Sequence, residues 1–582
     1  MATVNHKRTI QAAEVTAFGG IDASSPCGDG GVAADLKNFK VLSDGSLCRR
    51  SGFATLTSFE DAVRGAGTFR DAEGSFILVA EGTRLHRISL PDGTVQSADG
   101  LFTGEGKVTF FEHGGDVYFL DGTEMYRYTG GTAFEVCQGY VPLYGVDWLG
   151  ANSNNPVNEP INLLSGKIRI RYATRQTIQT LRFKIKLASV DWAVLGNTPI
   201  SLYGSTLSED GAMFSFGTAI DAAAVLTLYA TVDMSYYHDA WLRSCTEVAS
   251  YESFSASRTF LFGGEDPSQI FVSRPVDKAS LAAARVAAPN ATALYFPKDG
   301  AMRLENGLAV TAVDRVGDRM MICSEGQTWV TEELSKVDST LTVLPVRSLT
   351  QTAGSRSVGG LSVIDGEVPV TVSEGGVYRW EIDTNLERRC SFERISDGIA
   401  PLLPEGFATR ARLHYVRGED TLWLYDPEDP DGRVFLYDCA AKRWYSYVGI
   451  PATRLLETDG RVGFYDDNSI SFFDEHRSTD LCTFGEREIV GYYRSRRMDF
   501  GDGEAVKRAV RVYAESDLGD GELTVGLADG GLLDEVVFRG DGTGMKSYSA
   551  KVTPRRFQRV AVTLRATGGS PQRILGFCVH AR

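Results

Sequence analysis

The chain has 582 residues, more than one ordinary hydrophobic core can hold, so several domains are expected. Its 60 Lys and Arg residues against 75 Asp and Glu residues give a net charge of −15, which argues against nucleic-acid binding by the chain as a whole. No apolar run approaches the ~20 residues of a membrane-spanning helix and the first residues lack the apolar stretch of a signal peptide, so we expect a soluble protein made in the cytoplasm.

The first predicted element, residues 1–54, is an extended arm that ends in a hairpin. A Gly-Gly kink (FGGID, 18–22) is followed by a short connection (ADLKNF, 34–39) and by a hairpin (LSDGSLCRRSGF, 42–53) that turns at Asp44-Gly45. The glycines do not follow a strand and open a helix, so the segment is not a phosphate-binding loop. We expect the arm to reach neighbouring subunits.

A strand, a tight turn and a return strand at 368–380 (VPVTVSEGGVYRW) form a unit that recurs along the chain. Apolar residues occupy alternate positions on both sides of the turn, as in a β-hairpin. A hairpin of this kind cannot bury both faces alone, so copies mostly forty to sixty residues apart predict a β-propeller of six or seven four-stranded blades, at 55–148 and 249–482. The other six of the seven copies lie at 76–90, 117–128, 259–273, 320–330, 422–438 and 462–474.

The gap between the second and third copies is more than double the usual spacing and predicts an inserted β domain at 149–248. Residues 151–160 (ANSNNPVNEP) are typical of a linker, and apolar and basic side chains then alternate at 168–172 (IRIRY) and 181–187 (LRFKIKL). With further strands near 198–206 and 223–231, this pattern predicts an antiparallel sheet or small sandwich with a basic wet face. That face is either solvated or in contact with an acidic neighbour or DNA.

One helix is predicted at 275–286 (PVDKASLAAARV), with Asp277 as its candidate cap. Residues 483–582 then alternate short strands with glycine-rich turns, which predicts a C-terminal β-sandwich of jelly-roll type. Arginine is frequent there, so the domain either binds acidic protein surfaces or exposes a basic face to solvent. Its predicted strands are 490–493, 510–514, 522–527, 534–539, 548–552, 557–563 and 574–580.

We nominate no catalytic, cofactor-binding or metal-binding residue. Nine cysteines are scattered without a CxxC motif, and the seven histidines form no cluster. The acidic turn 426–432 (DPEDPDG) has Pro430 where a third calcium ligand should stand, and 324–329 (SEGQTW) resembles a sialidase box but lacks its aspartate. There is no GxSxG elbow and no P-loop, so the chain is expected not to be an enzyme and to need no cofactor.

The order of these motifs resembles that of tail nozzle proteins, also called tail tubular or stabilisation proteins, of short-tailed bacteriophages. In that family an NGG kink, an xNF or xNV element and a dGxLxxRxGf hairpin precede a propeller, which matches Gly19-Gly20, Asn38-Phe39 and 44–53 here. The segments 263–274, 372–378 and 434–444 resemble its blades. Ser51 stands where the family often has proline, which leaves related propeller-bearing tail proteins of other phages open.

The resemblance implies a structural protein of the virion tail, assembled in the host cytoplasm as a homo-oligomeric ring, six-fold in that family, through which the genome is ejected. Its implied partners are a head-to-tail adaptor or portal-side protein, a tail fibre, spike or tail-tip protein, and passing double-stranded DNA that is not bound sequence-specifically. Six copies at −15 each would carry −90. We expect acidic residues to line the channel and repel phosphates, and the basic stripes 167–186 and 494–511 to face partner proteins.

Two alternatives stay open. The chain could be a hub or attachment protein of a longer phage tail, or a carbohydrate-binding or glycosidase-like propeller, although a glycan-directed enzyme normally has an export signal.

Overall fold

The computed structural model describes residues 10–582 apart from 91, 98–101, 147–160, 174–176, 222–223, 253–256, 276–277, 305–306, 338–343, 383–389, 484, 502 and 569–571. The chain forms two compact units. The middle unit is Ala62–Gly354, and the terminal unit combines Met1–Asp61 with Ser355–Arg582. The predicted linker 151–160 and the predicted helix cap Asp277 lie outside the described residues.

The fold is all-β and of the propeller class. Seven four-stranded antiparallel blades can be followed along the described residues, four in the middle unit and three in the terminal unit. Each of the seven predicted hairpins is the central strand pair of one blade, which confirms the repeat that the sequence shows. The central strands are buried on both faces by neighbouring blades, as in β27 (Arg319–Ser324), which is buried at every position.

The blades of the middle unit are up-and-down meanders, in which each strand pairs with the next along the chain. Side chains such as Phe76, Leu78 and Phe119, buried to 2% exposure or less, pack the first two blades together. The strands are β6 (Val63–Asp71), β7 (Gly74–Glu81), β8 (Arg84–Ser89) and β9 (Val95–Ser97); β10 (Thr109–His113), β11 (Asp116–Leu120), β12 (Met125–Gly130) and β13 (Ala133–Val136); β22 (Glu247–Glu252), β23 (Ser257–Phe262), β24 (Gln269–Val272) and β25 (Ala301–Arg303); and β26 (Val310–Val316), β27 (Arg319–Ser324), β28 (Gln327–Thr331) and β29 (Val346–Thr350).

In the terminal unit, the blade of β38, β39 and β40 takes its fourth strand from the N-terminal part of the chain. Strand β5 (Gly52–Ser58) pairs with β40, and a further hairpin, β41–β42, extends the same sheet. The blade strands are β30 (Leu361–Ile364), β31 (Val368–Ser373), β32 (Gly376–Ile382) and β33 (Cys390–Arg394); β34 (Arg412–Val416), β35 (Thr421–Tyr425), β36 (Val434–Asp438) and β37 (Arg443–Tyr447); and β38 (Arg454–Thr458), β39 (Arg461–Tyr465) and β40 (Ser469–Asp474), with β41 (Thr479–Cys482) and β42 (Gly485–Glu488).

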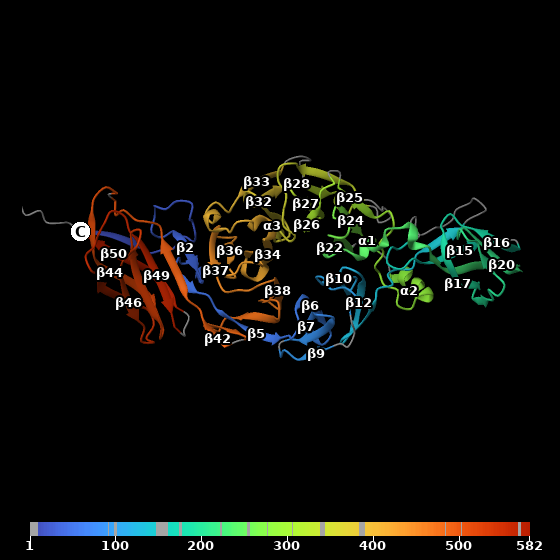
Figure 1. Ribbon diagram of the computed structural model, residues 1–582, viewed down its shortest axis with the longest axis horizontal. Coiled ribbons are helices and arrows are strands. Elements are labelled where there is room, and N and C mark those ends of the chain that lie inside the picture. The colour runs from blue at the N-terminus through green and yellow to red at the C-terminus, as the bar shows by residue number, and fades with distance from the viewer. Residues whose placement is uncertain are drawn as a thin grey trace, which may run out of the picture. The chain divides into compact units, whose positions relative to one another are not determined.

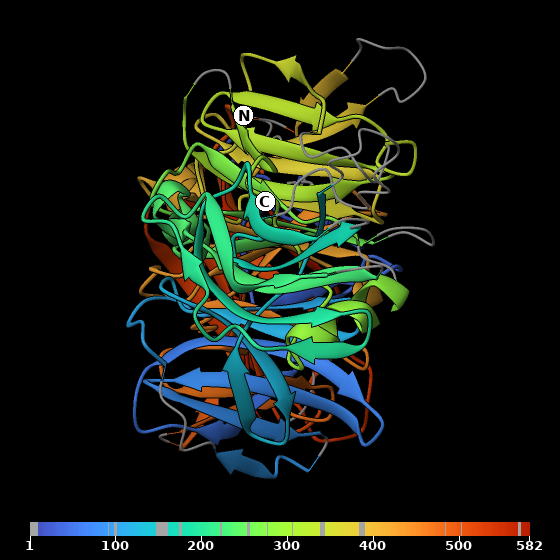
Figure 2. The same ribbon diagram turned by 90° about the vertical axis from the view of Figure 1, so that its right-hand side faces the viewer.

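Between the second and third blades, the middle unit contains the predicted insertion, a sandwich of two small sheets that faces the viewer in Figure 2. Ile168, Ile170, Tyr172 and Leu181 are buried as predicted, but β16 ends at Arg182 within the predicted alternation 181–187. The prediction of a basic solvent-exposed face is wrong at Arg169, which is only 8% exposed. The two sheets are β14 (Leu143–Val146), β15 (Lys167–Ala173), β21 (Val225–Val232), β17 (Leu187–Leu195) and β18 (Thr198–Ile200), and β16 (Ile178–Arg182), β20 (Met213–Ile220) and β19 (Thr206–Leu207).

The predicted helix is present as α2 (Lys278–Ala287). The other helices among the described residues are short, namely α1 (Asp239–Arg243), α3 (Phe407–Arg410) and the 3₁₀ turns η1 (Met234–Tyr236), η2 (Ala400–Leu402) and η3 (Arg417–Glu419). None of the helices in the described ranges has the length and apolar character needed to cross a membrane.

The C-terminal part of the chain folds into the predicted two-sheet sandwich, and residues 11–49, predicted as part of an extended arm, belong to that sandwich. These residues form strands in both sheets of the sandwich, where the blue β2 lies among the orange and red strands in Figure 1. The two sheets have the order β3-β4-β50-β44-β47, with β1 and β48 beside it, and β2-β43-β49-β45-β46. The strands are β1 (Gln11–Val15), β2 (Ala33–Lys37), β3 (Phe39–Val41), β4 (Leu47–Arg49), β43 (Gly491–Ser495), β44 (Lys507–Asp517), β45 (Glu522–Ala528), β46 (Leu532–Arg539), β47 (Lys546–Lys551), β48 (Arg556–Phe557), β49 (Ala561–Thr567) and β50 (Arg573–Ala581).

Candidate functional site

The N-terminal motif residues meet where the sandwich contacts the blades of the terminal unit. The Gly-Gly kink lays the chain against β37, since the amide of Ile21 donates to the carbonyl oxygen of Trp444 at 2.7 Å. Gly20 has a φ of 89°, and a Cβ there would stand 2.7 Å from the same carbonyl oxygen. Only glycine satisfies both the left-handed backbone and the close approach.

Asn38 joins three segments that are far apart in sequence. It adopts a left-handed φ of 57° between β2 and β3, a conformation that asparagine tolerates better than most residues. Its Nδ2 donates to the carbonyl of Val490 at 3.1 Å, and its Oδ1 accepts from the amide of Val448 and from Arg50 Nε, both at 2.9 Å. The side-chain amide therefore links the sandwich, the blade and the hairpin.

Arg50 forms the buried centre of this region. Its guanidinium makes two parallel bonds to Asp480, Nη1 to Oδ1 at 2.8 Å and Nη2 to Oδ2 at 2.7 Å, and both side chains are 1% exposed. The remaining donors reach the carbonyl oxygens of Ser51 and Val448. Such a planar, bidentate pair fixes orientation as well as distance, which lysine could not do. We call Gly20, Asn38, Arg50, Trp444 and Asp480 the N-terminal joint.

Neighbouring arginines reinforce the N-terminal joint. Arg49 Nη1 donates to the carbonyl of Ile489 at 3.2 Å, and burial lowers the pKa of Arg49 while Glu488 opposes the shift. Arg433 Nη2 lies 2.6 Å from Asp35 Oδ1, and Arg443 Nη2 donates to the carbonyl of Val41 at 2.8 Å. Each of these contacts connects residues of the first fifty with residues beyond 430.

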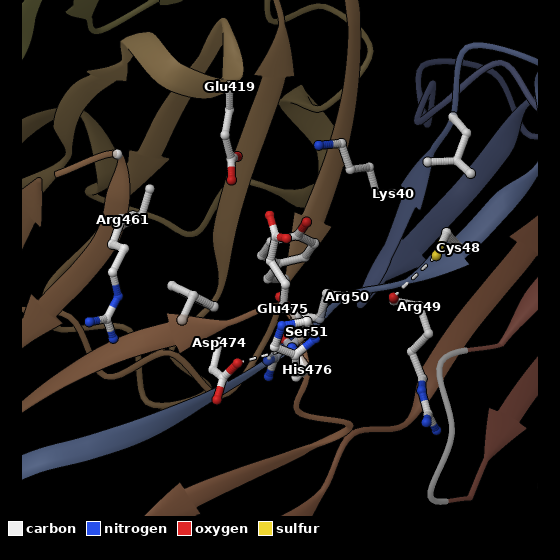
Figure 3. Close-up of a pocket in the computed structure, with 15 residues that line it drawn as sticks. Lys40, Cys48, Arg49, Arg50, Ser51, Glu419, Arg461, Asp474, Glu475 and His476 are labelled. Carbon is white, nitrogen blue, oxygen red and sulfur yellow. Dashed lines mark hydrogen bonds between the residues drawn. The ribbon is translucent and has the colours of Figure 1, made fainter. Parts of the chain in front are cut away.

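A cavity of about 580 Å³ opens beside the N-terminal joint (Figure 3). Its charges are of both signs. Burial raises the pKa of Glu419, and Lys40 opposes that shift. Burial also raises the pKa of Cys48, so its thiol stays protonated near neutral pH and is a poor nucleophile. The charged residues of the lining are Lys40, Arg49, Arg50, Arg461, Glu419, Asp474 and Glu475.

The described residues supply no metal centre, since no three of their His, Cys, Asp or Glu side chains are grouped to hold an ion. Asp426, the first acid of the calcium-like turn, is 1% exposed at its side chain and accepts from Arg410 Nη2 at 2.7 Å. An arginine therefore occupies the position that a cation would take. All nine cysteines lie within the described residues, and none of them is in a disulfide bond.

Sequence reasoning found the glycine kink, Asn38-Phe39 and the Arg49-Arg50 hairpin, but it assigned no role to Asp480. No local signal marks Asp480, which is one of 75 acidic residues and lies 430 positions beyond Arg50. The arginine run 494–511, predicted to face partners, is partly used within the chain, because Arg496 pairs with Asp22. Arg494 is exposed.

No protein-family model matches the chain, and no curated protein matches it. Among solved structures it is similar to the WD40 domain of SCAP from fission yeast, at 8% identity and a TM-score of 0.32, over 73% of this chain and 98% of that one. It is also similar to a chain of a mitotic checkpoint complex, at 8% identity and 0.34, over 73% and 93%. A third likeness is to Hsv2 of Kluyveromyces lactis, at 9% identity and 0.27, over 67% and 98%.

Proposed function

We propose that the chain is a structural protein of a bacteriophage tail, whose copies form a ring or tube segment of the nozzle kind. One observation supports the proposal most directly. The residues that carry the resemblance to nozzle proteins are also those of the N-terminal joint, where Gly20, Asn38 and Arg50 bond to the chain itself. A motif that supplied chemistry would instead direct polar atoms to a substrate.

A tail conduit has to keep its shape while DNA passes through it. The N-terminal joint suits that task, because its bonds connect residues 20–50 with residues 444–490 and are shielded from water. The Arg50–Asp480 pair, with both side chains 1% exposed, lies within this shielded region. Salt screens exposed pairs strongly and buried pairs much less, so the N-terminal joint would persist over a wide range of ionic strength.

The proposed partners are further copies of the chain, an adaptor or portal-side protein and a tail fibre, spike or tip protein. The net charge of −15 per copy supports a conduit that confines double-stranded DNA without gripping it, because each basic contact to phosphate would slow its passage. Exposed cations such as Arg494 are candidate contacts to acidic partner surfaces.

Size-exclusion chromatography with light scattering and negative-stain imaging of the purified full chain test the proposal. We expect rings or short tubes with a central hole. Asp480→Asn should impair ring formation, while the matched variant Glu522→Gln, at an exposed pair with Arg539, should leave it intact. A protein that stays monomeric at every concentration, or that binds glycans through its blades, would contradict the proposed function.

A further inference from the structure

The inserted sandwich carries an aromatic stack on the outer face of its larger sheet. The rings of Trp192 on β17 and Tyr229 on β21 are parallel, with centroids 3.7 Å apart and an angle of 3° between their planes. Tyr229 is 8% exposed and Trp192 is 36% exposed. The Tyr229 ring is therefore covered, and the Trp192 ring is open to solvent.

A β-bulge places Trp192 on this face. Val190 packs against the core of the sandwich, and regular alternation would turn residue 192 inward as well. The register between β17 and β21 shifts between Val190 and Trp192, so Asp191 is an extra residue. Trp192 consequently points outward beside Tyr229, while Ala193 is buried at 1% exposure. Bulges often re-aim a side chain at a functional position.

The stack is closed at one end. Arg169 is the register partner of Tyr229 on the neighbouring strand β15, and it is 8% exposed. Its Nη2 donates to the carbonyl of Val141 at 3.4 Å, and burial lowers its pKa. Tyr229 therefore lies between Arg169 and Trp192 in the sheet and covers one face of the Trp192 ring.

The other end of the stack is open. The edge strand β18 pairs only with residues 193–195, so the position opposite Trp192 is Ser201, a small side chain beyond the end of β18. Tyr203 follows two residues later and is 93% exposed.

A polar group borders the stack on the same face. Lys167 Nζ lies 2.9 Å from both Asp191 Oδ2 and Thr231 Oγ1, and Ser189 Oγ donates to Asp191 Oδ1 at 2.7 Å. Side-chain donors and acceptors thus stand together beside an apolar ring, and the Lys167–Asp191 pair is about one third exposed. The local charge of that pair is neutral, which does not favour phosphate.

From this arrangement we propose that the inserted sandwich binds a carbohydrate, with one sugar ring stacked on Trp192 and its hydroxyls bonded to Asp191 and Lys167. A pyranose has an apolar C–H face and a rim of hydroxyls, so it matches an aromatic ring bordered by a carboxylate and an ammonium group. Neighbouring hydroxyls can donate to the carboxylate and accept from the ammonium group. This inference does not depend on the function proposed above.

Titration calorimetry of the full chain with cellohexaose, chitohexaose and oligogalacturonate tests the proposal, with the single-stranded oligonucleotide dT12 as the competing ligand class. We expect at least one saccharide to bind, Trp192→Ala to weaken that binding at least about tenfold, and Asp191→Asn to weaken it at least about threefold. Trp192→Phe keeps an aromatic face and should stay within about threefold of the unmodified protein.

The matched control is Tyr236→Ala, which removes an aromatic side chain 60% exposed at another place, beside Lys186. It should leave saccharide affinity unchanged. Thermal melting of each variant separates loss of the ring from loss of the fold, and Trp192→Phe separates them again if Trp192→Ala melts early. Binding of dT12 alone through Trp192, equal saccharide affinity in Trp192→Ala, or no saccharide binding at all would overturn the proposal.

Discussion

Substitution of Asp480 by asparagine should destabilise the terminal unit more than removal of its partner Arg50. Asp480→Asn removes the counter-charge of Arg50, whose side chain is 1% exposed, and leaves it only neutral acceptors: the introduced amide oxygen, Asn38 and backbone carbonyls. Breaking a buried pair in this way costs about 3–5 kcal/mol. Arg50→Met is milder, because Asp480 keeps Arg487 Nη2 at 3.0 Å, whose side chain is 50% exposed, and the amide of Phe53.

The double variant Arg50→Met, Asp480→Leu should recover most of the loss, since an apolar pair of similar volume avoids the unpaired charge. Urea unfolding measures the difference. With a slope of about 3 kcal/mol per M, the Asp480→Asn midpoint should fall by about 1–1.7 M. The exposed pair of Arg539 and Glu522 provides the control, and Glu522→Gln should change the free energy by less than about 1 kcal/mol. Equal losses for Arg50→Met and Asp480→Asn, or a double variant weaker than both, would refute the reasoning.

Three further predictions follow from single side chains. Burial lowers the pKa of His113 to about 4, and its Nδ1 lies 2.9 Å from Thr259 Oγ1, so the contribution of the neutral ring to folding stability is present above pH 6.5 and is lost as the pH falls toward 4. Between pH 7 and pH 4.5, His113→Asn should therefore lose about 2.5 kcal/mol less unfolding free energy than the unmodified protein. An unchanged pH profile would contradict this. Gly52→Ala should lower the free energy of unfolding by several kcal/mol, because the added Cβ would collide with the Thr479 carbonyl. Gly418→Ala, in open space, should be nearly neutral, and similar denaturation midpoints for the two variants would show that the strand relaxes. Burial raises the pKa of the Cys137, Cys245 and Cys323 thiols to about 12, so these three should resist iodoacetamide at pH 8 until the protein is unfolded, and rapid native labelling of any of them would be inconsistent with their burial.

The seven hairpins could be predicted from the sequence because their evidence is local. A central blade strand is apolar at alternate or successive positions, and its turn lies within a few residues of it, as at 373–376. The same holds for α2 and for the strands of the C-terminal sandwich, whose periodicity and turn residues are contained in short windows.

The place of the N-terminal segment could not be predicted in this way. Strands β1, β2 and β4 find their partners in β50 and β43, more than 450 residues away, and periodicity indicates a strand without naming its neighbour. The burial of Arg169 was missed for a related reason. Alternation correctly placed it on the outer face, but could not show that the segment around Val141 covers that face. Trp192 was missed because no strand was predicted at 188–195, where two register shifts break the alternation of β17.

The pairing of the first strands with the last has a consequence for synthesis on the ribosome. Gln11 in β1 lies opposite Ala581 in β50, and Leu47 in β4 lies opposite Ile574. Residues 11–49 therefore emerge long before their partners, and the two sheets of the sandwich cannot be completed before residues 573–581 have been synthesised. A nascent or prematurely terminated chain would expose the unpaired edges of β1, β2 and β4, which are sites for chaperone binding or aggregation. The fold thus makes synthesis of β50 a condition for closing the sandwich around the N-terminal strands.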